Sequence, residues 1–132
     1  MDTNKIKWYG PFPISEISIV FQIDKYLDAH HTTRKLIGVY LYGIIENGEF
    51  VPLYVGRSDS DLKQELKTRY TTDEKFKICT HYTFCVLETA TDAYELESIL
   101  FHKAYKLNDI HPAKPKDDGH YKCPVEGCEY HE

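Results

Sequence analysis

The C-terminal tail holds side chains that could bind a metal ion. His120, Cys123, Cys128 and His131 lie close together in the sequence, and a Pro-x-x-Gly segment separates the two cysteines. Two thiolates and two imidazoles are a common tetrahedral ligand set for Zn²⁺, and a tight turn between the cysteines suits a zinc knuckle. The sequence therefore leaves two interpretations of this tail open: a structural zinc site, or a flexible tail that carries free thiols.

A second group of candidate residues lies on two segments that repeat one pattern around a predicted turn. Gly38-Val39-Tyr40 precedes Asn47-Gly48 and Tyr54-Val55-Gly56 follows it, within runs rich in β-branched and aromatic residues. An Asn-Gly pair between such runs is the strongest short-range signal for a β-hairpin. The two tyrosines can act in one site only if they lie on the same face of this hairpin.

The length of the hairpin loop decides which face each tyrosine takes. A two-residue Asn47-Gly48 loop with regular ladders places Tyr40 and Tyr54 on opposite faces. A three-residue loop, or a compensating bulge near Pro52, pairs Tyr40 with Tyr54 and gives them one face. A shared site therefore predicts a bulge in this hairpin.

The two motifs resemble those of the GIY-YIG nucleases, a family named for them. The resemblance implies an endonuclease that hydrolyses phosphodiester bonds in DNA with Mg²⁺ or Mn²⁺. It also implies that Tyr40 and Tyr54 act as base or orienting groups, and that Glu97 on a later helix binds the metal. Tyrosine has a reference pKa of about 10, so proton removal at neutral pH would need a neighbouring cation or a metal-bound water.

One position departs from the family pattern. The helix arginine that the resemblance implies falls on Glu65, and a carboxylate there would repel phosphate. Arg69, one turn further along the helix, and Arg57, directly after the second motif, could reach the same space. The alternative to a nuclease is a catalytically weakened domain of this fold that binds nucleic acid or a protein partner without cleavage. A zinc-containing interaction module with accidental motif similarity is a third interpretation.

The remaining periodicity predicts the elements that position these residues. A helix is expected over residues 61–70, a third strand over 76–88, and a second helix from Thr91 and Asp92 to about residue 107. With the hairpin, this order predicts an α+β sandwich whose small three-stranded, largely antiparallel sheet has flanking helices. The expected nuclease-like core covers residues 36–110, and residues 111–132 form the tail.

Residues 1–35 are expected to be an N-terminal extension that packs on the core. Within it, residues 8–13 should be irregular because Pro11 and Pro13 prevent regular strand pairing. Residues 14–23 fit either a strand or a short helix, because their apolar positions match both periods.

The composition is that of one globular domain. The chain has 132 residues, of which 42% are hydrophobic and 28% charged, and it holds no apolar run that predicts a membrane span. The first residues lack an apolar signal region, so a cytoplasmic protein is expected. A net charge of −5 argues against broad non-specific affinity for DNA, although DNA remains the expected partner of a local basic surface.

Overall fold

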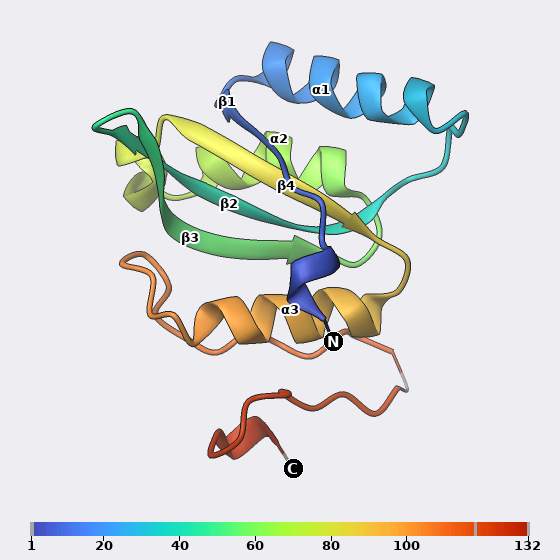
Figure 1. Ribbon diagram of the computed structural model, residues 1–132, viewed down its shortest axis with the longest axis vertical. Helices are drawn as coiled ribbons and strands as arrows, with labels where there is room; N and C mark the ends of the chain where they lie inside the picture. Colours follow the sequence, from blue (N-terminus) through green and yellow to red (C-terminus); the bar gives the residue numbers. More distant parts are fainter. Residues whose placement is uncertain (1, 118, 132) are drawn as a thin grey trace.

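The computed structural model describes residues 2–117 and 119–131. Its middle layer is an antiparallel sheet with the strand order β1-β4-β2-β3 (Figure 1). The strands are β1 (Tyr9–Pro13), β2 (Ile37–Glu46), β3 (Glu49–Ser58) and β4 (His81–Leu87). The described part of the chain therefore has four strands in its sheet, rather than the three that were predicted.

Helices cover both faces of this sheet. Helices α1 (Glu16–Ala29) and α2 (Leu62–Thr72) pack on one face, and α3 (Ala90–Phe101) packs on the other (Figure 1). The predicted α+β class with flanking helices is therefore confirmed. No helix in the described ranges is both long enough and apolar enough to pass through a lipid bilayer.

Alternate side chains of β2 contribute to both halves of the core. Tyr40 and Tyr42 pack with α1 and α2, whereas Val39 and Leu41 pack with α3. All four are buried, because β2 is a central strand that is covered on both faces. Burial on both faces explains why this strand is apolar without an alternation of polar residues.

Strand β1 corrects the prediction that residues 8–13 are irregular. Tyr9 pairs with Phe84 of β4, and Phe12 pairs with Tyr82, with a shift in register between the two pairs. Edge strands and bulges tolerate proline because they leave backbone N–H positions without a partner in the sheet. The segment thus adds the strand that the three-strand prediction missed.

The ambiguous residues 14–23 are helical from Glu16 onward, within α1. Ser15 caps α1, and its hydroxyl accepts a hydrogen bond from the backbone N–H of Ser18 at 3.0 Å. Ile19 and Ile23, four residues apart, are the buried positions of the helix. Both interpretations placed Ile17 on the buried side, and this is wrong because its exposed fraction is 84%.

The hairpin has the two-residue turn rather than the three-residue alternative. Asn47 and Gly48 have φ angles of 53° and 78°, as a type I′ turn requires. Glu46 pairs with Glu49 directly beside the turn. A regular ladder from this turn would place the motif tyrosines on opposite faces.

A bulge beside Pro52 restores the shared face. The register shifts there by one residue, with Leu53 as the extra residue, so that Tyr42 lies opposite Tyr54. The ring centroids of Tyr40 and Tyr54 are 6.4 Å apart. The predicted bulge near Pro52 and the shared face are therefore confirmed, whereas the direct pairing of Tyr40 with Tyr54 is wrong.

The predicted strand over residues 76–88 begins later than expected. A 3₁₀ helix, η2 (Glu74–Ile78), comes first, and the side chain of Asp73 caps it by accepting from the N–H of Lys75. Phe76 is buried from this short helix, and β4 starts only at His81. The alternating apolar pattern from Phe76 onward therefore spans two elements, the 3₁₀ helix η2 and the strand β4.

Helix α3 begins at Ala90, slightly before the predicted start, and ends at Phe101, well before the predicted end at about residue 107. Its cap is Thr89 rather than Thr91 or Asp92, and the Thr89 hydroxyl accepts from the N–H of Asp92 at 3.1 Å. The helix ends at Phe101, and Ala104 has a φ angle of 58°, which is outside the helical region. The chain after α3 is therefore free to turn back toward β3.

Candidate active-site cleft and metal centre

A cleft of about 500 Å³ opens at the edge of the sheet beside β3. Residues from both faces of the sheet meet here with residues of η2 and of the segment after α3. The lining consists of Tyr54, Arg57, Asp59, Glu65, Arg69, Lys75, Glu97 and residues 108–113. Of the residues predicted to carry chemistry, Tyr54, Arg57, Arg69 and Glu97 are therefore brought together, while Tyr40 does not line the cleft.

Tyr40 reaches the cleft only through Glu65. Its ring lies over Gly56, where an added Cβ would overlap the ring and hydroxyl of Tyr40. The glycine of the second motif thus leaves room for the tyrosine of the first. The Tyr40 hydroxyl donates to Glu65 Oε2 at 2.7 Å, and the residue has no exposed surface. Tyr40 is a buried donor that fixes a carboxylate in the wall of the cleft.

Neither motif tyrosine is suited to remove a proton at neutral pH. Burial raises the pKa of Tyr40 well above its usual value, and the charge of Glu65 raises it further. Burial also raises the pKa of Tyr54 to about 12, although the charge of Arg69 opposes this rise. Both hydroxyls therefore keep their protons, and an orienting role fits them better than the role of a base.

Arg57 is held between two carboxylates. Its Nη1 donates to Glu97 Oε1 at 2.7 Å. Its Nε and Nη2 donate to the two oxygens of Asp59 at 2.7 and 3.2 Å, a bidentate arrangement. The guanidinium also lies over the ring of Tyr94, 5.3 Å from the centroid. Because its side chain is only 9% exposed, Arg57 is a fixed cation in the wall of the cleft.

Glu97 combines burial with a cationic partner. It projects from α3 and is buried. Burial raises the pKa of Glu97 to about 7, although Arg57 favours the ionised form. A carboxyl group with this pKa can exchange a proton or a cation near neutral pH. Glu97 is therefore the most chemically adjustable group among those that line the cleft.

Arg69 and Lys75 are the more accessible cations of the cleft. Arg69 Nε donates to Glu65 Oε2 at 3.0 Å, and its side chain is 44% exposed. Its Nη groups have no hydrogen-bond partner in residues 2–117 and 119–131. Lys75 Nζ lies 5.4 Å from the centroid of the Tyr54 ring. Within the described lining, four carboxylates face three basic side chains, so the protein alone gives the cleft no excess of positive charge.

The far wall of the cleft is the segment after α3, which attaches to the open edge of β3. The N–H of Val55 donates to Asn108 Oδ1 at 2.8 Å, and Asn108 Nδ2 donates to the Val55 carbonyl at 3.0 Å. The N–H of Leu107 donates to the carbonyl of the bulged residue Leu53 at 2.8 Å. These bonds satisfy backbone groups on the side of β3 that faces no other strand.

Four His and Cys side chains, one of them from this wall, form a cluster that could hold a metal ion. The ligand atoms of His102, His111, Cys123 and Cys128 all lie within 4.8 Å of one another. Cys123 Sγ is 3.5 Å from His102 Nε2, a separation expected for two ligands of one tetrahedral ion. His111 Nδ1 donates to the Pro112 carbonyl at 3.1 Å, and its buried Nε2 has no hydrogen-bond partner in the described chain.

This cluster differs from the predicted ligand set in its histidines. His120 is exposed and lies outside the cluster. His131 is also outside it, and its Nδ1 donates to the carbonyl of Cys123 at 2.7 Å. His102 and His111 take their places, because the tail folds back on the end of α3 instead of forming a self-contained knuckle.

Several residues of these sites, Lys75 among them, were missed from the sequence. Asp59 could have been inferred, since it lies two residues after Arg57 and can pair with it. His102 and His111 belong to a C-terminal region rich in His and Cys, but their spacing does not show which of these residues meet. Asn108 lies in an aperiodic segment, and no local signal marks its contact with β3.

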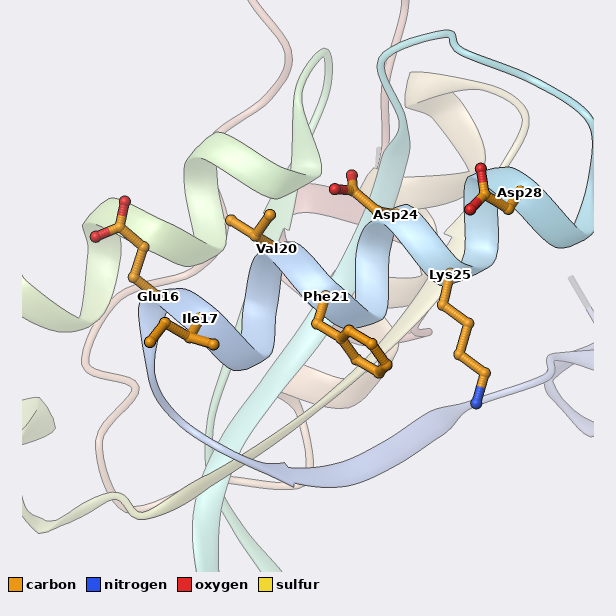
Figure 2. A pocket seen from close by; sticks show the side chains of 7 residues that line it. All are labelled: Glu16, Ile17, Val20, Phe21, Asp24, Lys25 and Asp28. Carbon is orange, nitrogen blue, oxygen red and sulfur yellow. The ribbon is translucent and has the colours of Figure 1, made fainter.

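A larger hollow, of about 780 Å³, runs along α1. Figure 2 shows that its lining comes from α1 alone and includes Ile17, Val20 and Phe21. Of its three acidic residues, Asp24 is paired with Lys63 of α2 at 2.7 Å and Glu16 with Lys67 at 3.4 Å. The hollow is an exposed apolar surface with no grouping of residues that could carry acid–base or metal chemistry.

No family model, curated protein or solved structure matches this chain. Its function has to be inferred from its own motifs and from the chemistry of the cleft.

Proposed function

We propose that the cleft beside β3 is the site of a divalent-cation-dependent endonuclease that hydrolyses phosphodiester bonds in DNA, as in the GIY-YIG nucleases that the hairpin motifs resemble. The observation that carries this proposal is the meeting of Tyr54, Arg69 and Glu97 in one cleft, although they belong to β3, α2 and α3. Phosphodiester hydrolysis needs a base, a cation beside the developing negative charge, and usually a metal held by a carboxylate.

Glu97 fits the binding of Mg²⁺ or Mn²⁺. Arg57 occupies Oε1 of Glu97, whereas Oε2 accepts no hydrogen bond from the described residues. Mg²⁺ commonly binds through one or two carboxylates and keeps several waters. When bound, the ion supplies a Lewis acid for a phosphate oxygen and lowers the pKa of a coordinated water. Its charge would also turn the slightly acidic cleft into one that attracts phosphate.

Glu65 is the residue to which we assign proton removal from the attacking water. Its Oε2 accepts from the Tyr40 hydroxyl and from Arg69 Nε, while Oε1 accepts no hydrogen bond within the described ranges. A carboxylate held by two donors has a fixed orientation, which favours proton transfer at the free oxygen. Glu65, the residue that departs from the family pattern, thus acts as the base in place of the protonated Tyr40 and Tyr54.

The cations of the cleft have separate tasks in this scheme. Arg69 and Lys75 are accessible enough to contact the phosphate and stabilise its developing charge. Arg57 is bonded to Asp59 and Glu97, so it orients Glu97 and helps to keep it ionised. Tyr54 contributes a hydroxyl donor on the floor of the cleft.

The same glutamate supports a second candidate function. Glu65 occupies the position where the resemblance implies an arginine, and it neutralises Arg69 through an ion pair at 3.0 Å. If Glu65 serves only to weaken the attraction for phosphate, the domain binds nucleic acid or a protein partner without cleavage.

Nicking of supercoiled plasmid in Mg²⁺ or Mn²⁺ tests the proposal. We expect the unaltered chain to nick, Glu97→Ala to be inactive, and Glu65→Gln and Tyr40→Phe to be slower. Matched controls are Glu95→Ala, on the same helix as Glu97, and Glu74→Gln, an exposed ion-paired glutamate outside the cleft. Equal nicking by all variants would locate the activity elsewhere. DNA retardation on a gel without any nicking would establish the binding function instead.

For the His/Cys cluster we propose Zn²⁺ as the ion. Two thiolates and two imidazoles suit Zn²⁺, whereas Mg²⁺ prefers oxygen ligands. Four protein ligands leave no open position, so the ion would be structural. Metal analysis of the purified chain should give one equivalent of zinc, and less than about half an equivalent would reject the assignment.

A further inference from the structure

The His/Cys cluster and the cleft share one residue. His111 lines the cleft and is also one of the four clustered ligands. His102 is the C-cap of α3, and Cys123 and Cys128 come from the tail. A metal ion at this place would therefore join α3, the wall of the cleft and the tail.

The surroundings hold these ligands in position even before an ion is considered. The N–H of Cys123 donates to the Tyr130 carbonyl at 2.7 Å, and His131 Nδ1 donates to the Cys123 carbonyl at 2.7 Å. The Tyr130 ring stacks on His111 with centroids 4.2 Å apart. Gly127 has a φ angle of 85°, which allows the tight turn that brings Cys128 back. Such contacts around the ligands are typical of a built metal site.

The wall of the cleft between the cluster and β3 is a short segment, residues 108–113, that makes few hydrogen bonds to the rest of the protein. Asn108 fixes one end to Val55, next to Tyr54, and His111 fixes the other end in the cluster. The two residues between them, Asp109 and Ile110, are exposed and form no hydrogen bond within the described chain. From the end of α3 to Cys128, the described residues contain no helix or strand.

We infer that a zinc ion bound by His102, His111, Cys123 and Cys128 is a cross-link that fixes this wall and, through Asn108, the edge of β3 beside Tyr54. Without the ion, the ordering of an irregular segment rests on a few contacts that must offset its conformational entropy. Loss of zinc should therefore open the wall and leave the sheet intact. The function assigned to the cleft rests on the proposed nuclease. The zinc cross-link does not, because it requires no catalysis.

Metal content of variants of the full chain tests the ligand set. His102→Ala and His111→Ala should lose stoichiometric zinc, whereas His120→Ala, the matched control from the same tail, should keep one equivalent. His131→Ala should still bind one equivalent, with an affinity roughly 10- to 100-fold lower, because it supports Cys123 without touching the ion. Cobalt in place of zinc in the unaltered chain gives a second readout, the visible absorption of tetrahedral Co²⁺ with thiolate ligands.

Hydrogen exchange before and after zinc removal by a chelator tests the effect on the cleft. The N–H groups of Val55 and Leu107 should exchange at least about tenfold faster without zinc, and their protection should return when zinc is added back. The N–H of Leu41, in the central strand β2, is the internal control and should not change.

The outcomes separate the cross-link from the nuclease. Zinc lost from His120→Ala but kept by His102→Ala and His111→Ala would overturn the ligand set. One equivalent of zinc with unchanged exchange at Val55 and Leu107 would overturn the cross-link. Zinc-dependent exchange in a chain that nicks no DNA would support the cross-link and reject the nuclease.

Discussion

At the scale of single residues, the cleft is governed by carboxyl groups on which burial and neighbouring cations act in opposite directions. Glu97 is buried yet bonded to Arg57, and burial dominates, so that its pKa rises to about 7. Glu65 is more accessible and accepts two donors at one oxygen. The two glutamates are therefore suited to different tasks, Glu97 to cation binding and Glu65 to proton transfer.

Glu97→Gln should make the protein more stable at pH 8 than the unaltered chain. The carboxyl group has a pKa of about 7 in the folded protein against a reference value of 4.5. The folded state therefore binds the proton more tightly, and stability is lost as the pH rises from 4.5 to 7. The variant should gain about 2–3 kcal/mol in the free energy of unfolding at pH 8, and much less at pH 5. Urea denaturation at both pH values measures this, with Glu95→Gln as control. A gain that does not change with pH would contradict the assignment of the shift to Glu97.

Glu65→Gln should separate DNA binding from DNA cleavage. Removing one negative charge a few ångströms from a bound phosphate should tighten binding by roughly threefold to tenfold. The amide still accepts from Tyr40 but is not a base, so nicking should fall by about 100-fold or more. Fluorescence anisotropy with labelled DNA gives the first quantity and the plasmid assay the second. Parallel loss of both would show that Glu65 is mainly structural.

At the scale of elements, the two motifs of the hairpin fit together because Gly56 of the second motif leaves space for the Tyr40 ring of the first. Tyr40 occupies the space above Gly56, and from that position its hydroxyl donates to Glu65. The bulge at Leu53 gives both motif tyrosines the same face and presents the carbonyl that Leu107 bonds. One irregularity in β3 therefore serves both the floor and the far wall of the cleft.

Gly56→Ala should destabilise the protein and impair the cleft. The new methyl group forces the buried Tyr40 ring to move, at a cost of about 1–3 kcal/mol, and breaks the bond to Glu65. Gly48→Ala is the matched control: it meets open space but has a positive φ angle, so it should cost about 1–2 kcal/mol without touching Tyr40. Thermal unfolding and nicking should show comparable instability in the two variants and a loss of activity only in Gly56→Ala.

The elements that sequence reasoning predicted well are those with local causes. Asn47-Gly48 requires positive φ angles, and Leu62 and Leu66 form a buried stripe behind the cap residue Asp61. The elements it missed depend on distant partners. Strand β1 forms because it can pair with the edge of β4. Rules based on the local sequence alone predict no strand there, because the segment contains two prolines.

The candidate site shows the same division. Tyr54, Glu97 and the two arginines could be expected together because the resemblance of the two motifs implied one shared site. The His/Cys cluster could not be expected, because Cys123 and Cys128 are close in the sequence while His102 and His111 meet them only after the tail has folded back. Composition indicated a tail that could bind a metal ion, and tertiary contacts determine which His and Cys side chains lie together.

At the scale of the whole molecule, the three layers place the cleft at the open edge of the sheet. Side chains from the α2 face and from the α3 face meet there, beside β3, which pairs with a strand on one side only (Figure 1). The tail closes the same edge through Asn108 and the His/Cys cluster. The C-terminal region therefore contributes to the cleft, although the sequence predicted a tail separate from the core.

The overall charge predicts weak and cation-dependent DNA binding with a shallow salt dependence. The chain carries a net charge of −5, and the cleft offers Arg57, Arg69 and Lys75 against four carboxylates. Phosphate contacts through these side chains alone should give a slope of log K against log salt no steeper than about −3. Binding without a divalent cation should be weaker still, because ionised Glu97 then repels the phosphate.

Anisotropy titrations at several salt concentrations, with and without Mg²⁺, would measure this slope. Lys75→Ala should make it shallower by about 1, whereas Lys77→Ala, from the same short helix but paired with Glu74 at 2.9 Å, should leave it unchanged. A slope near −6 would require about seven phosphate contacts, more than the cleft can supply. DNA would then be bound mainly by another surface, and the cleft would have to be reassigned to a smaller ligand.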